Sequence, residues 1–533
     1  MNWRILLLLY VCGLIAIWLV ARFQTSPGYM DAEYYYSGGY RLANGFGFSD
    51  PFIWNYLDNP QSIPHPSHAY WMPLVSILSA FGMVVSGRYD FFHARIVFIV
   101  LSAAIPPLTA WLSYTINKRV EAAIFSGLLA VFSGFYLAYL GTTDAFGLYM
   151  LFGALWFLCV GAQSKNIVNS SNYNFDAWRI LGLGIITGLM HLTRADGWIW
   201  LGVGLFWAVF KVQGIQHKNR KWLLLLLIFF LGYLVIMAPW IARNMRVFGS
   251  PLSIAGARTL WITDYDDIYV YPPEILTVIR WWDSGIGKIL SVRTWALGQN
   301  LQTTLAVQNE IFLLPLVVVG LWRLRSDLRV KYGILAWLAS FVMMTVFFPF
   351  TGVRGGFFHS GAAIQPLFWA VAPTGFDAIL QWGVRLRKWN ARLAGRVFRP
   401  GLIAIAMVLT LVLARQRVIG LDITHPAWNQ GYQYYSRLGK AIIERGIGSD
   451  DVIVVNNPPG FFLSTNLAAI VIPDGDQTTL LSVARRFGAR YVLLDDNHPS
   501  GLATLYNNPG DEPGLEYLTT IDAAHIFRVL ESP

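Results

Sequence analysis

Apolar runs long enough to cross a membrane recur along most of this chain. The first covers residues 5–20, and others follow up to residue 417. A helical run of roughly 20 apolar residues crosses a hydrocarbon core of about 30 Å. Only 13% of the 533 residues are charged, whereas soluble domains carry about 25%. These features predict a polytopic α-helical membrane protein.

Eleven spans are predicted from these runs, and one further stretch is ambiguous. The stretch 68–87, "HAYWMPLVSILSAFGMVVSG", could span or could lie along the interface as a half-buried helix. The predicted spans cover residues 4–22, 94–117, 121–141, 144–163, 179–194, 196–211, 222–242, 308–323, 332–350, 360–380 and 401–417.

The distribution of positive charge indicates whether the stretch 68–87 spans the membrane. If 68–87 does not span and the N-terminus is inside, the basic turns all become cytoplasmic, as membrane proteins prefer. These turns are Lys118-Arg119, Lys165, 211–221, 322–331 and 385–399. The same arrangement makes 23–93 and 243–307 large external loops. The first 417 residues carry 33 Lys and Arg against 17 Asp and Glu, and this excess indicates membrane orientation rather than a nucleic-acid partner.

Two smaller features bound the class further. The first apolar run lacks an A-x-A-like cleavage site, so we expect a retained helix rather than a signal peptide. The two cysteines, Cys12 and Cys159, both lie in apolar runs, which predicts neither a disulfide framework nor a CxxC metal site.

The pattern changes after residue 417. Residues 418–533 contain 7 Lys and Arg against 13 Asp and Glu. An amphipathic helix is predicted at 432–446, a strand at 451–455, a turn at "NNPPG", an apolar run at 467–472 and a helix at 477–488. Strands are predicted at 490–495, 515–520 and 525–530. This alternation predicts an α/β domain over 418–533, outside the cytoplasm by the parity of the spans, and a transmembrane domain over 1–417.

Conspicuous polar residues fall on the external side in this topology. Charged groups at membrane depth are expensive, so they usually line a cavity or pair with one another. Carboxylates and arginines at the mouth of an apolar bundle suit a substrate that is part lipid, part phosphate and part polar head. The residues are Asp31, Glu33, Asp144, Arg194, Asp196, Arg243, Arg354 and His359.

Each of these residues also has a purely structural interpretation. Asp31 and Glu33 could be interfacial charges, and Asp144 could cap the helix that follows it. Arg194 and Asp196 could simply pair, and Arg243 could be an arginine that snorkels from a helix end. The functional hypothesis therefore rests on the whole set.

The order of several motifs resembles the polytopic GT-C glycosyltransferases. An apolar helix precedes an Asp-led loop with Asp31, Glu33 and Tyr35, and the interfacial "HAYWMPL" follows. "LTRADG", "APWIARNMRVFGSPL" and the final α/β domain complete the pattern. The similarity is greatest to the protein O-mannosyltransferase and lipid A aminoarabinose transferase branch, including its bacterial members of unassigned substrate.

The resemblance implies transfer of a sugar from a polyprenyl phosphate or diphosphate to a lipid, glycan or protein acceptor on the outer face of the membrane. It implies that Asp31 is the catalytic base and that Asp144 shapes the site. A lysine that contacts the lipid phosphate in the aminoarabinose transferases is replaced here by His65, and a second cationic contact matches Arg194. The protein O-mannosyltransferases have Asp-Glu where this chain has Asp31-Ala32-Glu33.

We expect a carboxylate at Asp31 to take the proton of the acceptor hydroxyl. Arg194, Arg354, Arg243, His65 and His359 are the expected phosphate contacts.

Single displacement would invert the anomeric centre, and Tyr35, Tyr70 and Trp71 would line the sugar. No cofactor is indicated; a divalent metal is possible but has no signature. The main alternative is a transporter or flippase of lipid-linked sugars, which would need charges deep within several spans.

Overall fold

The computed structural model describes residues 1–161, 173–213, 221–448 and 451–530, so Lys165 and most of the loop 211–221 fall outside the described residues. The chain forms two compact units. Unit 1 comprises residues 1–23, 95–245 and 293–421. Unit 2 comprises residues 24–94, 246–292 and 422–533.

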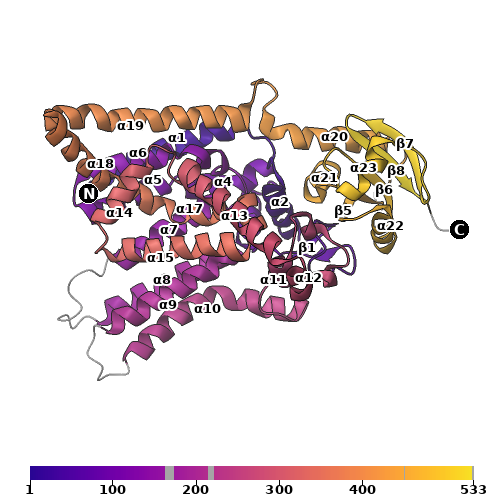
Figure 1. The fold of residues 1–533 in the computed structure, drawn as a ribbon, viewed down its shortest axis with the longest axis horizontal. Helices are drawn as coiled ribbons and strands as arrows, with labels where there is room; N and C mark the ends of the chain where they lie inside the picture. The colour runs from indigo at the N-terminus through magenta and orange to yellow at the C-terminus, as the bar shows by residue number, and fades with distance from the viewer. Residues whose placement is uncertain (162–172, 214–220, 449–450, 531–533) are drawn as a thin grey trace. The chain divides into compact units, whose positions relative to one another are not determined.

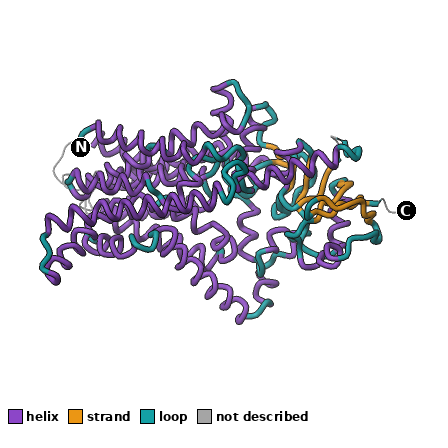
Figure 2. The backbone as a smooth tube through the Cα atoms, turned by 90° about the horizontal axis from the view of Figure 1, so that it is seen from above, coloured by secondary structure: helices purple, strands orange, loops and turns teal. Residues whose placement is uncertain are grey.

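Unit 1 is built from helices, as Figures 1 and 2 show. Its main elements are α1 (Trp3–Ala21), α4 (Phe91–Ser102, which begins in unit 2), α5 (Ile105–Asn117), α6 (Val120–Val131), α7 (Ala145–Gly161), α8 (Tyr173–Thr193), α9 (Trp198–Gln213), α10 (Lys221–Phe248, which ends in unit 2), α14 (Leu314–Arg323), α15 (Leu328–Val342), α17 (Phe357–Ala362), α18 (Gln365–Arg387) and α19 (Ala391–Ala414).

Five helical segments of the described residues are long and apolar enough to cross a membrane. They are Trp3–Ala21, Phe91–Asn117, Leu223–Phe248, Leu328–Phe347 and Ala391–Ile419. Shorter apolar helices accompany them, including Ala145–Gly161 and Leu314–Arg323. The class of integral membrane protein is therefore as the sequence predicts, while the number of eleven spans stays a prediction.

Some predicted spans are interrupted in the structure. The span 94–117 divides into α4 and α5, because Pro106 and Pro107 lie in the first turn of α5 and cannot continue a preceding helix. The span 121–141 consists of α6 and, after a break at Phe132, the 3₁₀ helix η1 (Gly134–Tyr139). In the span 308–323, the α-helix α14 begins only at Leu314.

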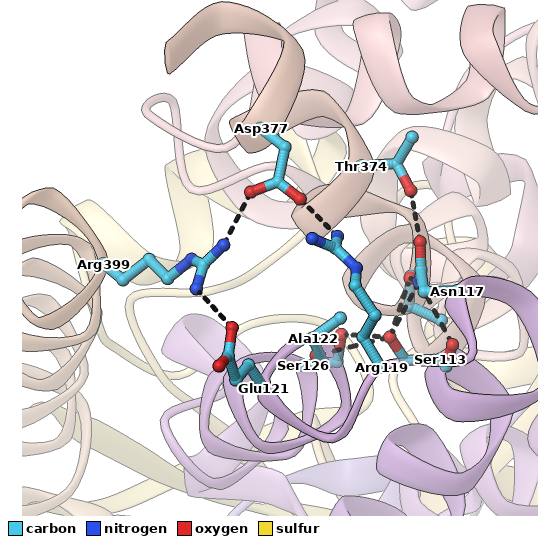
Figure 3. Close-up of polar contacts among 10 residues, drawn as sticks. Ser113, Asn117, Arg119, Glu121, Ala122, Ser126, Thr374, Asp377 and Arg399 are labelled. Carbon is cyan, nitrogen blue, oxygen red and sulfur yellow. Dashed lines mark hydrogen bonds and ion pairs between the residues drawn. The ribbon is translucent and has the colours of Figure 1, made fainter. Parts of the chain in front are cut away.

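A polar network joins helix ends of unit 1 (Figure 3). Asp377 of α18 pairs with Arg119 at the start of α6 and, at 2.7 Å, with Arg399 of α19. Arg399 also lies 3.1 Å from Glu121.

A third turn reaches the same end of the unit. Arg329 in the first turn of α15 donates to the hydroxyl of Thr115 in the last turn of α5, at 2.7 Å. Turns 118–119, 322–331 and 385–399, which the sequence places on one membrane face, therefore lie at one end of unit 1.

Unit 2 is organised around a six-stranded sheet with the strand order β2-β5-β4-β6-β8-β7. Strands β2, β5, β4 and β6 run parallel, and β8 and β7 are antiparallel to their neighbours. The strands are β2 (Phe52–Ile53), β4 (Val452–Val455), β5 (Ala468–Val471), β6 (Ala489–Leu494), β7 (Leu515–Ile521) and β8 (Ala524–Val529). The four strands predicted after residue 450 are confirmed, and the apolar run predicted at 467–472 forms the strand β5.

Four helices of unit 2 follow residue 429, and Figure 1 shows them around the sheet. They are α20 (Gln430–Ile443), α21 (Pro458–Thr465), α22 (Gln477–Arg486) and α23 (Ala503–Asn507). The helices predicted at 432–446 and 477–488 are confirmed. The turn predicted at "NNPPG" is wrong, because Asn457 caps a helix whose first residue is Pro458, and both residue types favour those positions.

The edge strand of the sheet comes from the first predicted loop. Phe52 and Ile53 pair with Ala469 and Ile470. Ile53 and Tyr56 are buried in one hydrophobic core with Leu480, Val492 and other residues of the C-terminal part. The loop and the residues after 421 thus form one folded unit, and the division at residue 417 stays a prediction.

Two helices of the first loop also belong to unit 2, α2 (Met30–Ala43) and α3 (Leu74–Ser86). They pack closely, since a Cβ on Gly39 would lie 2.4 Å from the Cβ of Ser79. The 13 residues of α3 extend about 20 Å at 1.5 Å per residue, which is too short to cross the hydrocarbon core. This length fits the interpretation of 68–87 as a segment that does not span. The second loop adds α11 (Ile254–Arg258), α12 (Val278–Asp283) and the start of α13 (Ile286–Gln302).

Candidate functional site

In unit 1, Asp144 and His359 form a buried pair. Asp144 precedes α7, and His359 lies within α17. His359 Nε2 is 3.3 Å from Asp144 Oδ2, and the Phe146 ring stacks on the imidazole at 3.8 Å between centroids. The other carboxylate oxygen of Asp144 accepts the N–H of Ala145 at the start of α7. Asp144 is therefore both an acceptor at the start of α7 and a partner of His359, while its role in a functional site stays a prediction.

The hydrogen bonds of His359 define where its protons lie. Its Nδ1 is 2.9 Å from the carbonyl oxygen of Gly355, which can only accept, so Nδ1 carries a proton. A hydrogen bond between Nε2 and Asp144 then requires one further proton, held by the imidazole or by the carboxyl group. The pair can hold and move one proton between these two atoms.

A second cluster is centred on Asp196, which follows Arg194 in the turn between α8 and α9. Arg194 Nε and Nη2 donate to the two carboxylate oxygens at 2.9 and 3.2 Å. Ser360 donates a short hydrogen bond to Oδ2, and Tyr149 donates to Oδ1 at 3.4 Å. The pairing of Arg194 with Asp196, which the sequence left as an alternative, is present. It fixes the plane and direction of the guanidinium.

The three turns that carry these residues are joined directly. Arg194 Nη2 lies 3.5 Å from the carbonyl oxygen of Gly356, and Ser360, one residue after His359, binds Asp196. The helix is kinked there, with φ of −76° at Arg354 and +122° at Gly355. The turns at Asp144, at Arg194 and at Arg354–His359 therefore meet within unit 1, as the predicted topology requires.

The remaining two arginines differ in setting. Arg354 is exposed, at the kink beside the Gly355–Gly356 pair. Arg243 is half-buried on α10, where it donates to Asn244 at 3.1 Å and lies 4.8 Å from the Trp240 ring centroid. These contacts of Arg243 lie on its own helix, as expected for a snorkelling arginine; its phosphate role stays a prediction.

In unit 2, Asp31 and Glu33 lie in the first turn of α2. Asp31 is half-buried, whereas Glu33 is buried with 2% of its surface exposed. Acidic side chains are favoured there because the helix dipole places partial positive charge at the N-terminus. Glu33 accepts a hydrogen bond of 2.7 Å from Asn457 Nδ2. Burial raises the pKa of Glu33 to about 7, although the bond from Asn457 opposes this shift.

The two histidines of "IPHPSHAYW" both have structural partners. His65 lies 2.8 Å from Asp58, in the short strand β3 (His65–Pro66) that pairs with β1 (Ser49–Asp50). The ring nitrogens of His68 are hydrogen-bonded to the hydroxyl groups of Ser67 and Ser76, at 2.8 and 3.0 Å. A phosphate contact by His65 stays a prediction.

Aromatic side chains gather beside α2. Trp71 stacks on Trp54 at 4.0 Å between centroids, and Tyr70 meets Trp54 edge-on at 5.1 Å. Tyr70, Trp71 and Trp54 are half-buried, whereas Tyr35 is only 2% exposed. The three half-buried rings are partly accessible, whereas Tyr35 packs inside, and the sugar-lining roles stay predictions.

The sequence reasoning missed several side chains in these clusters. Ser360, Tyr149 and Trp54 carry no motif, and only folding brings them to Asp196 or Trp71. Asn457 had a signal, since Asn followed by Pro is a helix start. Among residues 1–161, 173–213, 221–448 and 451–530, no three His, Cys, Asp or Glu side chains form a group that could hold a metal ion.

Comparison with known proteins shows the fold. No family model matches the sequence, and no curated protein matches it. Among solved structures, ArnT from Cupriavidus metallidurans bound to undecaprenyl phosphate matches with a TM-score of 0.56 and 11% identity, covering 99% of this chain and 98% of that one. The archaeal oligosaccharyltransferase AglB from Archaeoglobus fulgidus, in complex with an inhibitory peptide and a dolichol-phosphate, matches with a TM-score of 0.55 and 12% identity, over 91% of this chain and 69% of that one.

The chain thus shares the fold of these solved structures, and this likeness of fold agrees with the resemblance drawn from the motifs. The match to the Pmt1-Pmt2 protein O-mannosyltransferase of S. cerevisiae covers 49% of this chain with a TM-score of 0.33, which is too low to support an argument.

Proposed function

We propose that this chain is a membrane glycosyltransferase that moves a sugar from a polyprenyl phosphate or diphosphate to an acceptor hydroxyl. The observation that carries the proposal is the end-to-end match to a structure solved with undecaprenyl phosphate. The second match contains a dolichol-phosphate and a peptide. Both have a polyprenyl phosphate bound, which supports a lipid-linked donor here. The acceptor is a lipid, a glycan or a protein.

Asp31 is the proposed general base. An acceptor hydroxyl becomes a competent nucleophile when a positioned carboxylate takes its proton as the new bond forms. The first turn of α2 supports a carboxylate, because the helix dipole places partial positive charge there. Direct attack of the hydroxyl on the anomeric carbon, with departure of the carrier phosphate, inverts that centre.

The phosphate is the proposed partner of the cationic residues. Charge develops on the phosphate as it leaves, and guanidinium groups stabilise it through charge-assisted, often bidentate hydrogen bonds. Asp196 holds Arg194 in one orientation, which pre-organises it for this role. Arg354, Arg243, His65 and His359 are further proposed contacts, and Asp144 holds His359 in place.

The protein is proposed to lie in the cytoplasmic membrane, with its site on the face away from the cytoplasm. This placement rests on the basic turns and on the parity of the spans, which put Asp31 and the turns at Asp144, Arg194 and Arg354 on the same membrane face. The three turns that meet in unit 1 support it. The 418–533 segment is proposed to lie on that face too.

Sugar transfer in proteoliposomes tests the proposal. Purified protein is given a polyprenyl phosphate or diphosphate carrying a radiolabelled sugar, with membrane extract as the source of acceptor. A glycosyltransferase moves the label into a new product and releases the unlabelled carrier phosphate. Movement of the intact donor across the bilayer, with no new product, would instead identify a transporter.

A further inference from the structure

The segment that leads into α2 is held by side chains from far along the chain. Asn429 Oδ1 accepts the N–H groups of Thr25 and Ser26 at 2.9 and 3.2 Å and the hydroxyl of Ser26 at 3.1 Å. Trp428 Nε1 donates to the carbonyl oxygen of Ser26 at 3.1 Å. Asn429 is only 2% exposed. Four hydrogen bonds therefore fix residues 25–26, just before the helix.

Trp428 also determines how the chain passes into the helix. A Cβ on Gly28 would lie 2.2 Å from Trp428 Nε1, and Gly28 has a φ of +94°, so only glycine fits between the helix and the indole. Tyr29, the residue that precedes α2, meets the same indole edge-on at 5.6 Å. The direction of entry into α2 is thereby set.

A second set of contacts fixes the chain after Asp31, at Glu33. Asn457 Nδ2 donates to Glu33 Oε2 at 2.7 Å, and the side-chain oxygen Oδ1 of Asn457 accepts the N–H of Gly460 at 3.2 Å. A Cβ on Gly460 would lie 2.7 Å from Glu33 Oε2. The start of α21 therefore encloses the carboxylate of Glu33, and the orientation of the Asn457 amide is fixed because each end has a defined partner.

We propose that Trp428, Asn429 and Asn457 are positioning residues that place the Asp31 carboxylate by clamping the chain on both sides of it. This inference rests on the proposed function. The three residues follow residue 421, so the C-terminal part of unit 2 takes part in the reaction through the geometry of α2. A base displaced by about 1 Å can cost on the order of 10²-fold in rate.

A substitution of Asn457 can separate the positioning role of this residue, through its bond to Glu33, from its role as the cap of α21. In Asn457→Asp the new side chain has the same shape and still caps α21, since Asp and Asn are comparable N-caps. It can no longer donate to Glu33, and at a pH above the raised pKa of Glu33 two carboxylates then face each other. Adding Glu33→Gln restores the bond with reversed polarity, because the new amide at 33 donates to the new carboxylate at 457.

The experiment compares Asn457→Asp, Glu33→Gln and the double variant, with Asn507→Asp as a matched control on the exposed end of α23. We expect Asn457→Asp to lower kcat for sugar transfer about 10- to 100-fold with donor KM within about twofold. The double variant should return to the rate of Glu33→Gln alone, and the control should match the wild type. A mere loss of folding would not be repaired by the second change.

Hydrogen exchange of the backbone amides of residues 30–36 provides a readout that needs no turnover. We expect faster exchange in Asn457→Asp and wild-type exchange in the double variant and the control. Wild-type kcat in Asn457→Asp, or a double variant no better than Asn457→Asp, would overturn the positioning role while leaving the proposed function intact. If the wild type transfers no sugar, the proposed function fails, and unchanged exchange in Asn457→Asp would then reject the clamp on its own.

Discussion

His359 and Asp144 are separated by 215 positions in the sequence, and His359 Nε2 lies 3.3 Å from Asp144 Oδ2 in the fold. The bond of Nδ1 to the Gly355 carbonyl leaves Nε2 as the only ring atom available to the carboxylate. Side chains in such contact are energetically coupled, and their substitutions are not additive. We therefore expect the two side chains to act as a coupled pair.

The first prediction follows from this coupling. Asp144→Asn and His359→Gln should each lower kcat/KM for sugar transfer about 10-fold or more. The variant that carries both changes should lose no more than the worse of the two. The measurement is kcat/KM for the wild type and the three variants in a purified, monodisperse state. Losses that multiply would show that the two residues act independently.

Arg354 gives a prediction about the donor. It is exposed at the kink beside Gly355, and Arg354→Ala should weaken donor binding and turnover together. Arg354→Lys should restore them only in part, because an ammonium group lacks the planar fork that engages a phosphate bidentately. Arg325→Ala removes the same charge from an exposed position in the predicted cytoplasmic turn 322–331 and should behave as the wild type. Donor affinity measured by isothermal titration is the test, and an unchanged value in Arg354→Ala would exclude this residue from the site.

The raised pKa of Glu33 predicts that the stability of the folded protein depends on pH. Its pKa is raised from about 4.5 to about 7, chiefly by burial, with Asn457 as its hydrogen-bond partner and the Tyr435 ring nearby. The folded protein therefore binds a proton between these pH values that the unfolded chain does not, so stability increases as pH falls from 7 towards 4.5 and is lost as pH rises through 7. The Tm of the wild type minus the Tm of Glu33→Gln should therefore increase as the pH is lowered from 8 to 5. A difference in Tm that stays constant over this range would contradict the buried, ionisable carboxylate.

The membrane topology gives a fourth prediction. In a variant with Cys12 and Cys159 replaced by serine, a cysteine introduced at Asn507 should react with an impermeant thiol reagent in intact cells. A cysteine introduced at Lys388, in the basic segment 385–399, should react only after the membrane is opened. The opposite pattern would reverse the predicted orientation and place Asp31 in the cytoplasm.

The sequence predicts those parts of the fold whose signal is local. The apolar runs and the alternating pattern after residue 450 locate most helices and four of the five C-terminal strands, because burial against lipid or within a sheet repeats at a fixed period. The basic turns correctly group 118–119 with 322–331 and 385–399. The break after Val131 and the late start of α14 were missed, because hydropathy does not register where the backbone stops being helical.

The candidate site could be predicted only as a set of residues. Asp144, Arg194 and His359 were selected from their positions on one face, and the structure joins their turns. Ser360 and Tyr149, the hydrogen-bond partners of Asp196, were not foreseen, because these residue types are common in spans and only tertiary packing brings them to Asp196. The pairing of Phe52 and Ile53 with β5 is equally invisible in the sequence, since a strand of two residues has no periodicity.

Transfer of labelled sugar by Asp31→Asn is the most direct test of the account. The amide keeps the size of the side chain and cannot accept a proton at neutral pH, so loss of the base should reduce kcat on the order of 10²- to 10⁴-fold. Donor binding should persist because the proposed phosphate contacts are other residues, and Glu33→Gln should have a milder effect. Near-normal transfer by a monodisperse Asp31→Asn preparation would contradict the account, whereas a rate reduced at least 100-fold with donor binding intact is the result it predicts.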